Sequence, residues 1–166
     1  MKILRFLPLL SLVFLFGCPY QSQIPVSEAT LELDNSLFGK WQKVENITDE
    51  NPSYLEVSQA DEAHLSVLEF QFDQTDSVYK SKSYSAHLSQ VGEHTFVNLL
   101  ENQTPPFMIY LLDRTGHSTF ILREVTNNID EKFNSSADLS AFLGKYAELS
   151  FLYSKEETAY QKMKSE

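Results

Sequence analysis

The side chains best suited to acid–base or metal chemistry in this sequence are its four histidines. They are His64, His87, His94 and His117, and no two of them form a His-x-His or His-Glu-x-x-His pattern. Those spacings bring imidazoles together on one strand or one helix face. With a single cysteine, the common cysteine-containing zinc patterns are also missing. We therefore expect neither a metal site nor a cofactor.

A catalytic triad of serine, histidine and carboxylate leaves little trace in a sequence, because its members meet only in the fold. No Gly-x-Ser-x-Gly turn marks a nucleophile. The paired carboxylates Asp61-Glu62 and Glu156-Glu157 lie in polar segments, and we interpret them as solvated charge. We expect a protein that is not an enzyme. The least favoured alternative is a hydrolase, which predicts that His87 or another histidine bonds both a serine and a carboxylate.

The start of the chain combines positive charge, an apolar run and a lone thiol. Two basic residues lie among the first five positions, residues 6–16 are almost wholly apolar, and Gly17 directly precedes Cys18. This is the arrangement of an export signal. The apolar run is shorter than the roughly 20 residues that a membrane-spanning helix needs. Cys18 is the only cysteine, so it has no internal disulfide partner.

Leu15, Gly17 and Cys18 resemble the lipobox of bacterial lipoproteins, while Phe16 departs from it because a small residue is more usual there. The resemblance implies that the Cys18 sulfur receives a diacylglyceryl group, that the signal peptide of residues 1–17 is removed, and that the new amine is acylated, for example with palmitate. Two or more acyl chains hold a protein stably on a bilayer. We expect a lipid-anchored protein of the cell envelope, at the outer membrane if the host has one.

Residues 18–36 follow as a polar stretch with proline, serine and glutamine early and acidic residues later. This composition predicts a lipidated cysteine followed by a flexible tether, which would reach on the order of 60 Å when fully extended. Residues 37–166 are long enough for a single domain. With 42% hydrophobic and 13% aromatic residues in the chain, a sizeable core is expected.

The charge balance limits the partners of this domain. Without the two basic residues of the leader, the remainder carries 11 basic and 23 acidic residues, a formal charge of −12. Nucleic acid is therefore a poor partner, because phosphate binding needs a basic footprint. A cationic protein would be attracted more easily.

Seven segments after residue 36 read as strands separated by turn residues, which predicts an antiparallel sandwich or barrel. In the second half of residues 64–73, Leu68, Phe70 and Phe72 share one face, but Leu65 and Val67 have the opposite phase. This predicts either a bulge near Val67 or burial on both faces. The seven segments are residues 37–44, 54–58, 64–73, 78–89, 95–100, 107–112 and 119–125.

The first strand contains Gly39-Lys40-Trp41, which resembles the Gly-x-Trp of the first strand of lipocalins and of lipocalin-like bacterial lipoproteins. The resemblance implies that Trp41 closes the bottom of a β-barrel, and it makes Arg123 a candidate for the arginine that packs across that tryptophan. The chain lacks the family's Thr-Asp-Tyr in its middle part. The fold expected is mainly β, a lipocalin-like antiparallel barrel or strongly curved sheet with a C-terminal amphipathic helix.

The helix is predicted over residues 136–146. Ser135 can cap it, and an apolar stripe of period 3.6 recurs on one side. Such a helix should lie against the sheet or plug one end of it. The last segment, residues 155–164, has glutamate and lysine that suit a helix, but Thr158-Ala159-Tyr160 suits a closing strand. We favour the strand.

Aromatic side chains recur along these strands, and they either fill a small barrel or line a cavity in it. We expect a non-catalytic binding module for a small apolar ligand, and the alternative is an acidic module that binds or inhibits a cationic protein. The first predicts an internal apolar pocket, and the second predicts a solid interior beneath an acidic face. The candidate cavity residues are Trp41, Phe70, Phe72, Tyr84, Phe96, Phe107, Tyr110 and Phe120.

Overall fold

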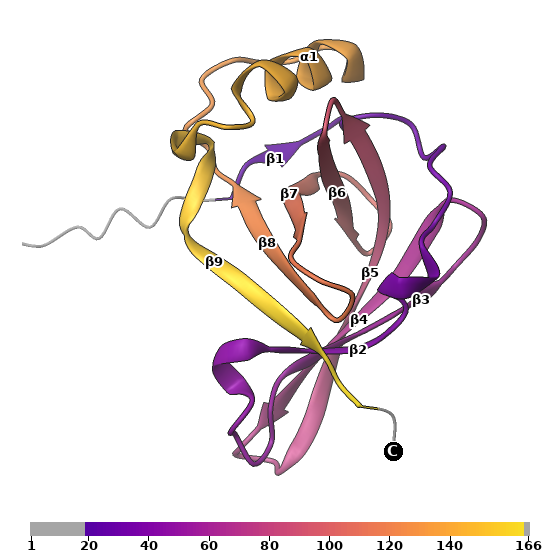
Figure 1. Cartoon of the computed structure of the whole chain (residues 1–166), viewed down its shortest axis with the longest axis vertical. Coiled ribbons are helices and arrows are strands. Elements are labelled where there is room, and N and C mark those ends of the chain that lie inside the picture. The colour runs from indigo at the N-terminus through magenta and orange to yellow at the C-terminus, as the bar shows by residue number, and fades with distance from the viewer. Residues whose placement is uncertain (1–18, 165–166) are drawn as a thin grey trace, which may run out of the picture.

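The computed structural model describes residues 19–164, which form a closed eight-stranded antiparallel β-barrel with one helix beside it (Figure 1). Neighbouring strands follow the order β7-β6-β5-β4-β3-β2-β9-β8, and pairing of β7 with β8 closes the circle. The mainly β, lipocalin-like fold expected from the sequence is confirmed. The strands are β1 (Gln21–Ser22), β2 (Gly39–Lys43), β3 (Tyr54–Gln59), β4 (His64–Asp73), β5 (Val78–Val91), β6 (His94–Glu101), β7 (Phe107–Arg114), β8 (Thr119–Val125) and β9 (Tyr153–Lys162).

Alternation along each strand divides the side chains between the barrel interior and its outer surface. On β5, Tyr84, Ala86 and Leu88 point inward, whereas His87 and Ser89 belong to the opposite face and are nevertheless buried. The register of β4 with both neighbours is continuous over its length, so it has no bulge near Val67. Burial on both faces, the second interpretation, holds only in part: Leu65 and Val67 are buried on the inner face, and Leu68, Phe70 and Phe72 are half-buried on the outer face.

The predicted tether is wrong for residues 19–36, the part of it that the structure describes. Residues 19–37, which we call the strap, run across the outer face of the barrel, and β1 within it pairs with β7. Val26 is fully buried, and its N–H donates to Asn98 Oδ1 at 2.7 Å. The strap ends in the short helix η1 (Asn35–Leu37), where Leu37 is buried. The domain therefore includes these residues and does not begin at residue 37.

The polar composition of the strap has a physical explanation in its hydrogen bonds. It crosses a part of the barrel whose outward side chains are polar, so its own polar groups find partners there. His87 Nε2 donates to the carbonyl oxygen of Ser27 at 2.8 Å, and Ser27 Oγ donates to Ser89 Oγ at 2.7 Å. The polar composition of the strap is typical of a solvated segment, but specific hydrogen bonds attach it to the barrel surface.

The helix α1 (Ser136–Tyr146) forms where the sequence predicts it. Ser135 Oγ accepts a hydrogen bond from the N–H of Asp138 at 3.2 Å, which caps the first turn. Leu139 and Leu143 are fully buried and join a core with outward residues of the barrel such as Phe96. After α1 the chain passes through η3 (Ser150–Leu152) into β9, so the segment favoured as a closing strand is a strand.

Trp41 is buried at the end of the barrel that the strap reaches. Its ring packs against Phe120, with ring centroids 4.6 Å apart, and its Nε1 donates to the carbonyl oxygen of Leu37 at 2.8 Å. The cation over the indole is Lys162, whose Nζ lies 5.3 Å from the ring centroid. Arg123, the sequence-based candidate for that position, instead pairs with Asp113 and Glu157.

Within residues 19–164, no helix has both the length and the apolar character needed to cross a membrane.

Candidate functional site: a cavity inside the barrel

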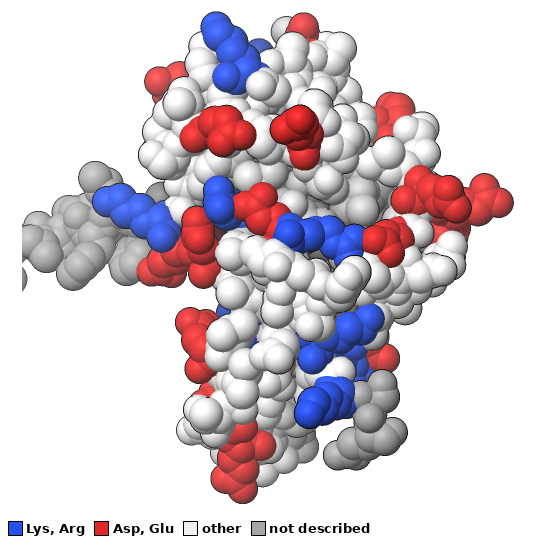
Figure 2. All heavy atoms as spheres, viewed as in Figure 1, with Lys and Arg blue, Asp and Glu red and all other residues white. Residues whose placement is uncertain are grey.

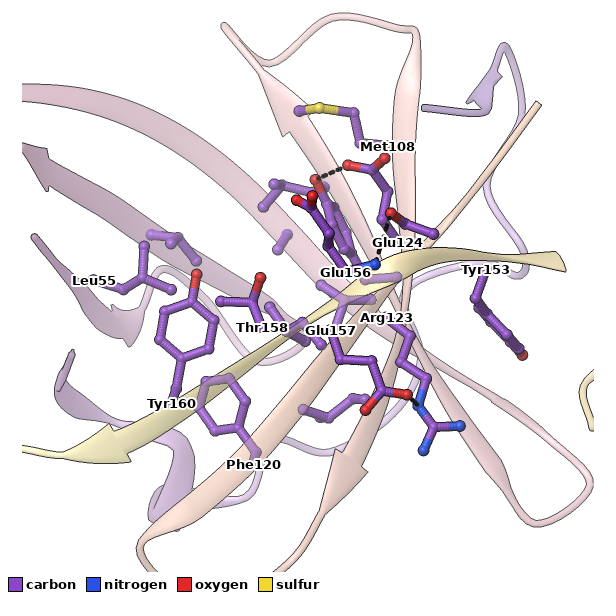
Figure 3. A pocket seen from close by; sticks show the side chains of 18 of the residues that line it. Leu55, Met108, Phe120, Arg123, Glu124, Tyr153, Glu156, Glu157, Thr158 and Tyr160 are labelled. Carbon is purple, nitrogen blue, oxygen red and sulfur yellow. Dashed lines mark hydrogen bonds and ion pairs between the residues drawn. The ribbon is translucent and has the colours of Figure 1, made fainter. Parts of the chain in front are cut away.

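The barrel contains a partly open cavity of about 1150 Å³ (Figure 3). Its wall is mainly apolar and comes from inward positions of nearly every strand, including Leu55, Val67, Leu99, Met108 and Leu122. Pockets for drug-sized ligands are typically about 300–1,000 Å³ and mostly apolar. The space is therefore large enough for a small organic molecule.

Small and large side chains alternate around the cavity wall. Ala86, Val57 and Val97 stand at inward positions, and they leave more space than aromatic residues would. Large inward side chains, among them Tyr84, Tyr110, Phe120 and Tyr160, line other parts of the wall. Other aromatic side chains, such as Phe96 and Phe107, lie on the outer side of the strands.

Two hydrogen-bonded pairs of tyrosine and glutamate are among the polar groups of this wall, which also includes Lys43, Arg123 and Glu157. Tyr84 on β5 donates its hydroxyl to Glu69 Oε2 on β4 at 3.1 Å. Tyr110 on β7 and Glu124 on β8 are register partners, and the Tyr110 hydroxyl donates to Glu124 Oε2 at 3.5 Å. All four residues line the cavity. A carboxylate oxygen accepts several hydrogen bonds, so each pair keeps capacity to bind a ligand donor.

Burial changes the acid–base behaviour of these groups. Loss of solvent raises the pKa of Tyr84 to about 12, and the neighbouring Glu69 carboxylate adds to the effect. The pKa of Tyr110 is raised above its ordinary value, chiefly by burial and secondly by Glu124. Burial also raises the pKa of Glu124, against the opposing hydrogen bond from Tyr110. The tyrosines therefore remain protonated donors throughout the physiological pH range.

The structure brings three of the eight predicted cavity residues to the wall: Tyr84, Tyr110 and Phe120. Trp41 belongs to the same core cluster and packs beneath Phe120, but it does not line the open space. For these four residues, the prediction that the aromatic side chain lies inside the barrel was correct.

The prediction was wrong for the other four residues, which do not line the cavity. Phe70 stacks on Tyr54 with ring centroids 4.7 Å apart, and Phe72 meets Tyr79, all on the outward phase of their strands. Phe96 and Phe107 are buried on the outer face in the core shared with the strap and α1. A residue type alone does not say which face of a strand it occupies when both faces are covered.

Sequence reasoning missed Glu69 and Glu124, although their position in the alternating pattern was a usable signal. Glu69 has the same phase as Leu65 and Val67, and Glu124 has the same phase as Phe120. A lone acid in phase with a core-facing set is expected either at a strand end or with a buried partner. Here each acid has a tyrosine partner.

Two of the histidines are neighbours: His64 and His87 are register partners on β4 and β5, with ring centroids 5.8 Å apart in an edge-to-face arrangement. His64 Nδ1 lies 2.9 Å from Asp61 Oδ1, and His94 Nε2 lies 3.1 Å from Glu148 Oε1. His87 bonds a backbone carbonyl, and burial lowers its pKa. Between residues 19 and 164 no hydrogen bond links one histidine to both a serine hydroxyl and a carboxylate, and no three metal-ligating side chains gather.

The lipidation predicted at Cys18 and the signal peptide of residues 1–17 lie outside the described residues. Pro19, the first described residue, forms a bridge with Thr126 at the end of β8. A scan against protein-family models finds no match, and no curated protein or solved structure is significantly similar to the chain. The site must therefore be interpreted from its own geometry.

Proposed function

We propose that this protein is a lipid-anchored lipoprotein of the cell envelope whose barrel binds a small, largely apolar ligand without chemical conversion. The observation that carries the proposal is the cavity of about 1150 Å³ with its mainly apolar wall. Apolar surface removed from water contributes roughly 25 cal/mol per Å², so a ligand buried in such a wall gains most of its affinity there.

The polar groups of the cavity suit orientation of a ligand more than catalysis. The two carboxylates are held by tyrosines on adjacent strands, and no nucleophile with a base partner faces them among the lining residues. A few fixed polar groups in an apolar pocket are typical of small-molecule sites. Glu69 and Glu124 would accept hydrogen bonds from a hydroxyl or amine on the ligand.

Support for the anchor comes from Leu15, Gly17 and Cys18 in the sequence, together with the absence of any other cysteine. The proposed lipid anchor and the apolar cavity are consistent with each other, because apolar small molecules are concentrated at membranes. An acidic inhibitor module would have a solid interior beneath an acidic face. The interior is hollow, and Figure 2 shows acidic and basic residues interspersed on the face displayed.

The test uses the chain from Pro19 onward, which contains the whole described fold, purified from cells. Native mass spectrometry should show a small molecule bound to the wild-type protein. Ala86→Phe places a ring in the cavity, whereas Ala141→Phe makes the same change at an exposed position of α1. We expect the bound mass to be lost from the first variant and kept by the second.

A binding assay with an uncharged naphthyl fluorophore complements the mass measurement. The fluorophore should bind the wild type and Ala141→Phe, and binding should be weakened several-fold by Ala86→Phe. A wild-type protein that is released empty and does not bind the fluorophore would contradict the proposal. Circular dichroism of both variants establishes that each retains the barrel.

A further inference from the structure

The strap begins at one defined corner of the barrel. Pro19 bridges Thr126, and the N–H of Tyr20 donates to the carbonyl oxygen of Val125 at 2.9 Å. The N–H of Thr126 in turn donates to the carbonyl oxygen of Leu152 at 2.9 Å. Pro19, the residue that follows Cys18 in the sequence, therefore lies next to the end of β8 and the start of β9 (Figure 1).

Two large apolar side chains are exposed at this corner. Leu149 and Phe151 flank Ser150, and each is 45% exposed. Their backbone is fixed: the N–H of Leu149 donates to the carbonyl oxygen of Tyr146, and Asn128 Nδ2 donates to that of Phe151, both at 2.9 Å. A leucine and a phenylalanine that are exposed close together on a fixed backbone are more typical of a contact with an apolar partner than scattered surface residues are.

The cavity extends to the same corner. Asn128, Ser150 and Phe151 belong to its lining, as do Lys155 and Glu156 on the first part of β9. Phe151, Lys155 and Glu156 are exposed. Here β9 departs from regular pairing, because Arg123 pairs with Glu157 while Val125 pairs with Tyr153. The extra residues of β9 form a bulge opposite Glu124, and the exposed Lys155 and Glu156 within it line the cavity.

We infer that this corner, which we call the membrane end, rests on the lipid bilayer with Leu149 and Phe151 in the interfacial region. The inference rests on the proposed lipidation of Cys18. Acyl chains on Cys18 bring the bilayer within one residue of Pro19, and the chain after Pro19 is bound to the barrel instead of forming a spacer. The mouth of the cavity then faces lipid, so an apolar ligand passes between bilayer and cavity with little exposure to water.

The other exposed apolar residues mark the opposite end and provide controls. Val44 and Ile47 lie in and after η2 (Val44–Asn46), and Val78 and Tyr79 lie at the β4–β5 turn. Figure 1 shows these two turns together, far from α1 and the start of β9. Charges of both signs surround the membrane end, among them Glu148 and Lys155. We therefore expect apolar contact, with little dependence on anionic lipid, to set the orientation.

The experiment uses the full chain, expressed so that it is processed, extracted from the membrane and reconstituted into vesicles of phosphatidylethanolamine and phosphatidylglycerol. Once Cys18 is acylated, an introduced cysteine is the only free thiol. Phe151→Cys reports on the membrane end. Val78→Cys, at a side chain that is 50% exposed, reports on the opposite end. Each is labelled with a polarity-sensitive fluorophore, and lipids brominated in the acyl chain serve as quenchers.

We expect a blue-shifted emission and several-fold stronger quenching at position 151 than at position 78. Leu149→Cys, at the adjacent exposed position, should behave like position 151 and guards against a local effect of one substitution. Equal emission and equal quenching at both ends would overturn the orientation. Repeating the measurement without phosphatidylglycerol should leave the difference unchanged.

The two proposals fail in distinguishable ways. If the mass of the wild-type chain shows no acyl groups and Cys18 reacts with the fluorophore, the lipid anchor is wrong and the orientation falls with it. If the chain is acylated but position 151 is as water-exposed as position 78, only the orientation is wrong. Cys18→Ser should abolish acylation and release the protein from the vesicles.

Discussion

The two sides of the barrel wall are built in opposite ways. On the outer face of β5, β6 and β7, Phe96 and Asn98 are fully buried beneath the strap and α1, and the buried polar groups there have partners. On the inner face, Leu99 and Met108 of the same strands are only half-buried, because they face the cavity. The protein thus has two packed cores, one on the outer face beneath the strap and α1 and one inside the barrel around Trp41 and Phe120, and the cavity lies beside the inner one.

The strongest test of this comparison is to remove the largest fully buried side chain of the outer core. Phe96 is 0% exposed and contacts the cluster shared with α1. Phe96→Ala should lower the free energy of unfolding by about 3–5 kcal/mol, the range for a buried phenylalanine whose space cannot collapse. Urea unfolding followed by circular dichroism measures it. The exposed Tyr79→Ala is the control, and a loss for Phe96→Ala no larger than for this control would refute the outer core.

A leucine-to-alanine pair compares the two faces with the chemistry held constant. Leu111 on β7 is 3% exposed on the outer face, and Leu99 on β6 lines the cavity. Leu111→Ala should cost about 2–5 kcal/mol of stability, while Leu99→Ala should cost less because its neighbours already border empty space. Both values come from urea unfolding. The reverse order, with Leu99→Ala the more costly, would contradict the looser packing of Leu99 beside the cavity.

The attachment of the strap depends on one buried amide. Asn98 Oδ1 accepts from the N–H of Val26 at 2.7 Å, and Asn98 Nδ2 donates to Ser89 Oγ at 2.8 Å. Asn98→Ala leaves a buried N–H without an acceptor and should cost about 1–3 kcal/mol. Limited proteolysis should then cut within residues 19–37. Asn51→Ala, at an exposed position of the β2–β3 connection, is the matched control, and equal protease resistance of the two variants would argue against this role for Asn98.

The same contrast explains what sequence reasoning found and what it missed. The strands and α1 were predictable because alternation and the Ser135 cap are local signals. The face of each aromatic was not, because both faces of the barrel wall are covered here, so the period of two no longer distinguishes inside from outside. Phe96 and Phe107 were therefore assigned to the cavity, although they lie on the outer face of the barrel wall. The strap was missed because its polar groups bond to His87 and Asn98, contacts that no local pattern reveals.

The smallest expected effect is a pH dependence at the strap. His87 is buried beneath it, and burial holds the pKa of His87 below its ordinary value of 6.5, against the hydrogen bond to Ser27. The unfolded chain therefore binds the proton more readily than the folded chain. Stability from this residue is complete above about pH 6.5 and is lost as the pH falls through the lowered pKa of the folded state.

His87→Gln keeps a donor for the Ser27 carbonyl but removes the titration. We expect the wild type to lose more stability than His87→Gln between pH 7 and about pH 5, measured as the shift in urea midpoint. His117→Gln, at an exposed position, is the control and should lose as much stability as the wild type. Carboxylates that titrate below this range contribute equally to all three proteins. If His87→Gln kept the full pH slope of the wild type, the destabilisation would come from other groups. The contact between His87 and the strap would then not depend on His87 being neutral.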